Sequence, residues 1–206
     1  RFGLTPNVTA DPAEALATFA EAGAEWAHVV DLDGARAGAP VQHDLLAALA
    51  AADKVILPGV GAAGYAMEQI DARGLVEPLR ALTRPVLGIC LGMQLLFERS
   101  EEEDTECLGI LPGRVRRLEP APGRPVPHMG WSRLSVADDG IGLADGDYVY
   151  FAHSFACDDG EATLARADYG RPIPALVRRG NFTGAQFHPE RSGEAGARFL
   201  EAWLKS

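Results

Sequence analysis

Residues 85–98 read PVLGICLGMQLLFE and pass from an apolar strand pattern into a helical pattern within a few positions. Cys90 stands at the join, with Gly88 and Gly92 two places to either side. A sharp strand-to-helix turn lifts such a side chain off a sheet, and the helix start behind it offers free amide donors and the positive end of a dipole. This stretch predicts an α/β sheet in which a central strand ends at an exposed thiol.

The spacing of the glycines around Cys90 matches the nucleophile elbow of G-x-S-x-G enzymes, with sulfur in place of oxygen. Glycines keep side-chain bulk away from the nucleophile, and amides at the helix start can hold a developing oxyanion. The same helix start predicts a lowered pKa for the thiol. On this segment alone, a nucleophile and a buried structural cysteine are equally open interpretations.

A second motif, QFHPE at 186–190, ends an apolar strand and places His188 two residues before Glu190. Residues i and i+2 of an extended chain point the same way. Pro189 puts the tripeptide at a strand's end, because proline cannot donate to a central sheet ladder. A base that a carboxylate orients toward a thiol follows the logic of a catalytic triad. A histidine beside a glutamate is by itself typical of a surface pair, so the catalytic interpretation depends on both motifs.

The predicted pattern of helices and strands changes along the chain. The predicted elements of the α/β part and the chain end are strands 54–57 and 85–89 and helices 62–72, 74–82, 91–99 and 192–205. Alternating strands and helices imply parallel strands with crossover connections. From about residue 107, short strands separated by Gly, Pro and Asp turns predict an added antiparallel region.

The composition and charge argue against several classes of protein. The formal net charge of the 206 residues is −10, which argues against nucleic acid, because a phosphate-binding surface needs a basic patch. No apolar run reaches the roughly 20 residues that span a bilayer, and the start does not resemble a signal peptide. Three cysteines without framework spacing predict a cytoplasmic protein. The histidines lack metal-ligand spacing, so neither a metal nor another cofactor is expected.

Five segments together resemble a known family. They are PGVGAAGYAM (58–67), GICLGMQLLFE (88–98), PHMGW (127–131), AHSF (152–155) and GAQFHPE (184–190). The chain resembles the class I glutamine amidotransferases over about 52–206, and most closely the glutaminase subunits of imidazole glycerol phosphate synthase in histidine biosynthesis. The resemblance implies an open, mostly parallel sheet with flanking helices and an added antiparallel strand region.

The resemblance also implies roles for individual residues. Cys90 attacks the side-chain amide of glutamine to give a glutamyl thioester and ammonia, His188 moves the proton, and Glu190 orients His188. The implied oxyanion and loop residues are Gly59, Val60, Gly61 and Leu91. The residues implied to hold the substrate glutamine are Gln94, His153, Ser154 and Phe155. The implied partner is the cyclase (βα)8-barrel subunit of the synthase, which uses the ammonia.

The front of the chain departs from this family, because the usual opening turn is missing. Residues 11–50 resemble a fragment of the ProFAR isomerase (βα)8 barrel, chiefly through GAEWAHVVDLDGARAG at 23–38. We therefore expect an atypical helix-strand-helix segment over 1–51 and an amidotransferase domain over 52–206. One or two βα units cannot close a barrel, so no isomerase catalysis is expected.

The strand at 85–89 needs neighbours on both sides, because unpaired backbone groups are costly inside a sheet. Strand 54–57 supplies one neighbour, and strand 26–32 is predicted to replace the family's first strand as another. Its residues Val29, Val30 and Leu32 are then buried, and helix 12–22 packs outside.

Two other functions remain open at this stage. One is a stand-alone cysteine hydrolase of γ-glutamyl substrates, which needs no partner. The other is a catalytically impaired interaction protein, whose atypical N-terminus leaves a partner-binding surface without turnover. The intact set of Cys90, His188 and Glu190 argues against the second of these.

Overall fold

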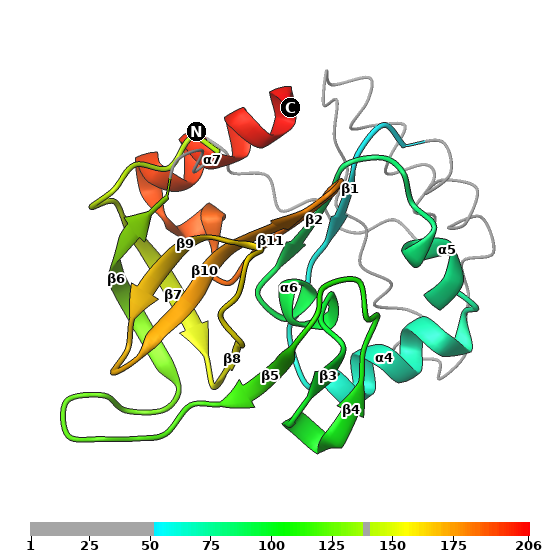
Figure 1. Ribbon diagram of the computed structural model, residues 1–206, viewed down its shortest axis with the longest axis horizontal. Coiled ribbons are helices and arrows are strands. Elements are labelled where there is room, and N and C mark those ends of the chain that lie inside the picture. The colour runs from blue at the N-terminus through cyan, green and yellow to red at the C-terminus, as the bar shows by residue number, and fades with distance from the viewer. Residues whose placement is uncertain (1–51, 138–140) are drawn as a thin grey trace, which may run out of the picture.

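A computed structural model describes residues 52–137 and 141–206 and shows a twisted sheet with helices on its two faces (Figure 1). Within these ranges no helix has the length and apolar character needed to cross a membrane. The predictions made for the segment 1–51, including helix 12–22 and the burial of Val29, Val30 and Leu32, lie outside the described residues.

The described strands form a large sheet and a small one. In spatial order the large sheet contains β1 (Val55–Leu57), β2 (Val86–Ile89), β11 (Phe182–Ala185), β10 (Pro172–Arg179), β9 (Thr163–Asp168), β6 (His128–Val136) and β7 (Tyr148–His153). The small sheet contains β4 (Thr105–Glu106), β3 (Arg99–Ser100), β5 (Arg114–Arg117) and β8 (Phe155–Cys157). The helices are α4 (Ala63–Ala72), α5 (Val76–Arg80), α6 (Leu91–Leu95) and α7 (Gly193–Lys205), with 3-10 turns at Glu102–Asp104 and Pro189–Arg191.

The pairing confirms the predicted fold class. Strands β1, β2 and β11 run parallel to one another, as the alternating pattern requires. Strands β10, β9, β6 and β7 continue the sheet with antiparallel pairs. This antiparallel region is the larger part of the sheet that the structure describes.

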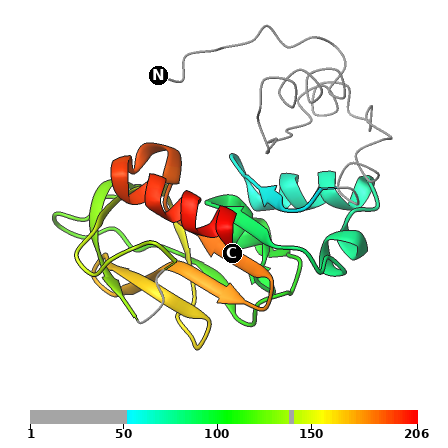
Figure 2. The same ribbon diagram turned by 90° about the horizontal axis from the view of Figure 1, so that it is seen from above.

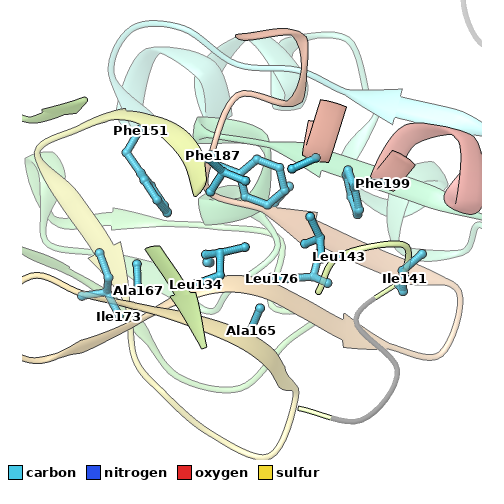
Figure 3. Close-up of a cluster of buried hydrophobic side chains, with 14 of the residues drawn as sticks. Leu134, Ile141, Leu143, Phe151, Ala165, Ala167, Ile173, Leu176, Phe187 and Phe199 are labelled. Atoms are coloured by element: carbon cyan, nitrogen blue, oxygen red, sulfur yellow. The ribbon is translucent and has the colours of Figure 1, made fainter. Parts of the chain in front are cut away.

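The sheet divides the core into two clusters. Successive residues of a strand point to opposite faces, and in β2 Val86 packs with the cluster under α4 to α6, whereas Leu87 packs with the cluster under α7. From α7, Phe199 and Trp203 are fully buried in the second cluster, which Figure 3 shows around Phe187 and Leu176. Figure 2 shows α7 crossing the sheet from the antiparallel strands toward β1 and β2.

The helix predicted over 91–99 is shorter than expected. It ends at Leu95, because a later loop takes the backbone carbonyls that would continue it. The amides of Leu108 and Gly109 donate to the carbonyls of Leu95 and Phe97 at 2.9 and 2.8 Å. The apolar side chains of the segment are buried, but hydrogen bonds to the later loop replace the hydrogen bonds that would continue the helix.

One neighbour of the nucleophile strand is a strand that the sequence analysis did not place there. Strand β2 lies between β1 and β11, with Gly88 opposite Leu57 on one side and Gly184 on the other. The predicted placement of strand 26–32 in this sheet falls outside the described residues. The sequence reasoning overlooked that the strand before His188 could return to the centre of the sheet.

Candidate active site

Cys90 occupies a strained corner between β2 and α6. Its backbone has φ 54° and ψ −110°, in the half of φ space that favours glycine. Its amide donates to the carbonyl of Ala185 at 2.8 Å, and its carbonyl accepts from the amides of Met93 and Gln94. Strain of this kind persists only where the surroundings over-determine it, and these hydrogen bonds tie the corner to both β11 and α6.

The two glycines beside Cys90 are needed for close backbone contacts. A Cβ atom on Gly88 would lie 2.6 Å from the carbonyl oxygen of Gly92. One on Gly92 would lie only 1.8 Å from the carbonyl oxygen of Leu57 in β1. The predicted requirement for small residues around the thiol is confirmed.

The predicted lowering of the thiol pKa is wrong. Burial of the side chain raises the pKa of Cys90 to about 11, and the negative charge of Glu190 adds to the rise. A hydrogen bond from the Leu91 amide acts in the opposite direction without offsetting the burial. Helix α6 has only five residues, so its dipole is weak. The thiol therefore needs a base to remove its proton near neutral pH.

A cavity of about 330 Å³ opens at the Cys90 corner. The predicted site residues that line it are Gly59, Val60, Gly61, Cys90, Leu91, Gln94, His153, Ser154, Phe155 and His188. Three further residues line it that the sequence reasoning did not assign, namely Glu102, Pro127 and Ala152. Glu190 stands behind His188, and the structure thus brings the whole predicted set to one place.

His188 and Glu190 form a hydrogen-bonded pair at the cavity. The Nδ1 atom of His188 lies 2.8 Å from Oε1 of Glu190, and their side chains are 16% and 58% exposed. The geometry differs from the predicted extended chain, because Pro189–Arg191 forms a 3-10 turn. This turn, rather than strand alternation, lets the carboxylate reach the ring. Since Nδ1 is occupied, Nε2 is the ring atom left to exchange a proton.

Besides the Leu91 amide, the sulfur of Cys90 contacts one backbone carbonyl and one side-chain amide of the described residues. Its Sγ lies 3.9 Å from the carbonyl oxygen of Ala152 and 3.8 Å from Nε2 of Gln186. Gln186 also accepts a hydrogen bond at Oε1 from Nε2 of Gln94, at 2.9 Å. Sequence reasoning missed Gln186, although its position two residues before His188 in GAQFHPE was an available signal.

His153 lines the cavity, and a second buried histidine, His128, contacts it. The Nδ1 atom of His153 lies 2.7 Å from the carbonyl oxygen of Phe155, and its Nε2 lies 3.0 Å from Nδ1 of His128. Burial lowers the pKa of each histidine to about 4, so both rings are neutral near pH 7. Both nitrogens of His153 have protein partners, and the ring forms part of the wall without a free polar atom.

Glu102 is the one carboxylate among the residues that line the cavity. Its Oε2 accepts a hydrogen bond of 2.8 Å from the amide of Ala63, the first residue of α4. The helix start stabilises a negative charge there. In the sequence this residue belongs to the acidic run 101–104, from which no role was predicted.

Fold and site together define a glutamine amidotransferase, and the comparisons agree. The chain matches the family Glutamine amidotransferase class-I over residues 30–205 and belongs to that family. A solved structure titled glutamine amidotransferase shares the fold, with a TM-score of 0.62, 23% identity and coverage of 94% of each chain. The match begins at residue 30, and the predicted isomerase origin of residues 11–50 finds no support in these comparisons.

Three relatives carry the same name, that of one subunit of a synthase. The imidazole glycerol phosphate synthase subunit HisH of Xanthomonas axonopodis pv. citri is 53% identical over 162 residues, which cover 77% of this chain and 81% of that protein. The subunit HisH of Xylella fastidiosa strain Temecula1 is 54% identical over 160 residues, with coverage of 76% and 80%. That of Idiomarina loihiensis is 51% identical over 156 residues, with coverage of 75% and 79%.

Proposed function

We propose that this chain is the glutaminase subunit of an imidazole glycerol phosphate synthase, which hydrolyses glutamine and passes ammonia to a cyclase subunit. The observation that carries the proposal is the cavity that joins the strained Cys90 corner to His188 and to the predicted glutamine-holding residues. The identity of 51–54% to synthase subunits HisH supports the choice of enzyme within the family.

Catalysis starts with proton transfer from Cys90 to Nε2 of His188. The thiolate then attacks the amide carbon of glutamine, and the tetrahedral intermediate collapses as the carbon–nitrogen bond breaks. The proton on His188 goes to the leaving nitrogen, which departs as ammonia. Water, deprotonated by the same histidine, hydrolyses the thioester and returns the thiol. Glu190 keeps the ring oriented and offsets its positive charge through the 2.8 Å contact.

The oxyanion of the intermediate needs amide donors near the sulfur. The Leu91 amide already forms a hydrogen bond to Cys90, and the Gly59–Gly61 loop lines the same cavity. Preorganised amides at a developing oxyanion are typically among the largest contributions to such a reaction. We assign this function to Leu91 and to the loop residues Val60 and Gly61.

The substrate is held by groups of matching charge and polarity. Glutamine carries an α-ammonium group, and Glu102 offers it the carboxylate among the lining residues. Gln94 donates both amide hydrogens to protein acceptors, Phe155 and Gln186. Its Oε1 atom therefore remains to accept a hydrogen bond from the substrate. Ser154 and Phe155 complete the wall beside it.

A partner subunit would account for exposed apolar side chains in the cavity loop and on strands β6 and β7. Val60 in the cavity loop is 88% exposed, and Trp131 and Tyr148 on the paired strands β6 and β7 are 53% and 56% exposed. Exposed aromatic side chains are enriched at protein interfaces. Ammonia released into water is largely protonated and loses its nucleophilicity, which supports direct transfer to a cyclase (βα)8 barrel.

A glutaminase assay of the purified chain, alone and with a barrel-type synthase subunit and its nucleotide ligand, tests the proposal. We expect slow hydrolysis alone and a large increase in the presence of both. Full activity that no partner changes would favour a stand-alone γ-glutamyl hydrolase. Partner binding without hydrolysis under any condition would favour an impaired interaction protein. The division of the chain at residues 51 and 52 remains a prediction that the same assay, made on truncations, addresses.

A further inference from the structure

Gln186 is a fully buried polar side chain directly beside the reactive sulfur. Its exposed fraction is 0%, and its Nε2 atom lies 3.8 Å from Sγ of Cys90. Its backbone is fixed as well, because its amide donates to the carbonyl of Ala175 at 2.9 Å. The residue before it, Ala185, accepts a hydrogen bond of 2.8 Å from the amide of Cys90. Gln186 and Cys90 are therefore held in register by the parallel strands β11 and β2, at whose ends they lie.

The orientation of the Gln186 carboxamide follows from its other partner. Gln94 donates from Nε2 to Phe155 and to Oε1 of Gln186, both at 2.9 Å. Rotating the Gln186 amide by half a turn would place its NH2 group against that of Gln94, and two donors cannot satisfy each other. Gln94 therefore selects the orientation in which Gln186 directs its donor at the sulfur.

We propose that Gln186 is a positioning residue that donates a hydrogen bond to the Cys90 thiolate and holds the sulfur in the cavity. This inference rests on the proposed glutaminase site. In the thiol form, the S–H group can donate to the carbonyl oxygen of Ala152, 3.9 Å away. After His188 takes the proton, that carbonyl has nothing to accept. The Gln186 carboxamide and the Leu91 amide then remain as donors to the negative sulfur.

Such a donor matters more here than in an exposed site. Burial is the main cause of the raised pKa of Cys90, and a charged group with little water around it depends on protein hydrogen bonds. Hydrogen bonds to charged groups are shorter and stronger than neutral ones. The bond to Gln186 should therefore strengthen when the thiolate forms, which aids the step that the buried thiol finds most difficult.

Alkylation of Cys90 by iodoacetamide tests the inference without using glutamine. The variant Gln186→Met keeps the length of the side chain and removes both donor and acceptor. We expect its alkylation rate at pH 8 to fall about ten- to a hundredfold, as for the loss of a hydrogen bond to a charged group. The pH profile of the rate should move to higher pH by about one to two units, since one unit corresponds to a tenfold change. Mass spectrometry of the peptides assigns the label to Cys90.

The variant Gln186→Glu provides a second measurement, which still tests the inference if Gln186→Met does not fold. It keeps an acceptor for Gln94 but replaces the donor near sulfur with a carboxylate oxygen. We expect a loss of alkylation rate at least as large as in Gln186→Met, and a fall in kcat for glutamine hydrolysis with KM changed less than about twofold. Thr183→Val, in strand β11 just before Gln186 but not lining the cavity, is the matched control and should behave like the parent protein.

A folded Gln186→Met or Gln186→Glu protein that alkylates at the parent rate, with an unchanged pH profile, would overturn the inference. If the methionine variant does not fold, the glutamate variant decides the question. A failure of the proposed function can be told apart from a failure of this inference. The former would leave the parent chain without glutamine hydrolysis in the presence of the cyclase. Alkylation of Cys90 would still report whether Gln186 supports the thiolate.

Discussion

Strands β2 and β11 are parallel neighbours, and each carries one half of the site at its end, but they hold it in different ways. Strand β2 ends in a corner with φ 54° at Cys90, closed by backbone contacts to Leu57 and Ala185. Strand β11 ends at Ala185, and the chain then continues through Gln186 to His188 and forms a 3-10 turn. The nucleophile is fixed by the main chain, whereas the base is fixed by a side-chain hydrogen bond to a half-exposed carboxylate. The two ends should therefore differ in their tolerance of substitution.

The largest effect is expected at the end of β2 itself. Cys90→Ala removes the nucleophile, and we expect glutamine hydrolysis to fall by at least about a thousandfold, as when the nucleophile of a triad is removed. The fold should persist, because alanine is smaller than cysteine and the corner already holds a residue with a Cβ atom. A glutaminase assay with thermal unfolding as the control for folding measures both. Retained hydrolysis would remove Cys90 from the mechanism.

A smaller but still large loss should come from the corner glycine. In Gly92→Ala the new methyl would lie 1.8 Å from the carbonyl oxygen of Leu57, so β1 and the corner must separate. We expect a fall of about a hundredfold in activity and a cost of about 1–3 kcal/mol in the free energy of unfolding, as for overpacking. Gly160→Ala is the control, because nothing lies within 4 Å of a Cβ atom there. Equal behaviour of the two variants would contradict a corner fixed by the main chain.

A substitution at the end of β11 should have a milder effect, which slows hydrolysis but speeds alkylation of the thiol. Glu190→Gln keeps an oxygen that can accept from Nδ1 of His188 but removes the negative charge. We expect hydrolysis to fall about tenfold, below the usual effect of general acid–base catalysis because the carboxylate is exposed. The same charge raises the pKa of Cys90, so alkylation of the thiol by iodoacetamide should become faster. A parallel fall of both rates would show that Glu190 acts in some other way.

The contrast between the two strand ends also explains what sequence could predict. The corner was predictable because its cause is local: two glycines around a cysteine between a strand and a helix pattern. The pairing of His188 with Glu190 was predicted with the wrong geometry, because the 3-10 turn at Pro189–Arg191 depends on how the chain enters α7. The order of strands was missed for a similar reason, since no local pattern says that β11 returns beside β2.

Properties that depend on burial were the least predictable. The raised pKa of Cys90 comes from desolvation by residues far apart in the sequence, which outweighs the local helix start. The roles of Gln186 and Glu102 near the cavity depend on contacts across the sheet and with α4. The sequence contains both residues, but only the tertiary arrangement brings them to the thiol.

Acid should destabilise the buried pair His128 and His153 before it alters the Cys90 corner. His128 and His153 have pKa values lowered to about 4 by burial, below the ordinary value of 6.5. The unfolded chain thus binds more protons between these values. The stability that the neutral pair contributes is present above pH 6.5 and is lost as the pH falls toward 4. We expect a loss of about 3 kcal/mol for each ring, since the pKa falls from 6.5 to about 4 and one pKa unit is worth about 1.4 kcal/mol.

Urea unfolding at pH 6.5, 5.5 and 4.5 measures this dependence. His128→Asn keeps an amide donor near the position of Nδ1 and removes one titrating ring, so the loss between pH 6.5 and 4.5 should be about half that of the parent. Carboxylates contribute equally in both proteins and cancel in the comparison. An unchanged loss in the variant would mean that the buried pair does not govern the acid response.

The smallest effect on activity is expected at the two cysteines that lie away from the corner. Cys107 and Cys157 are at least as buried as Cys90. Burial raises the pKa of the Cys107 thiol to about 11 and holds the pKa of Cys157 well above its ordinary value. Neither lines the cavity, so burial and a high pKa do not make a nucleophile without the strained corner and its base. Cys107→Ala and Cys157→Ala should hydrolyse glutamine at the parent rate, while Cys157→Ala costs about 1 kcal/mol of stability from the small cavity left in the core. Labelling with a glutamine-analogue alkylating agent should mark Cys90 in both variants, and labelling of Cys107 or Cys157 in its place would show that the corner is not what selects the reactive thiol.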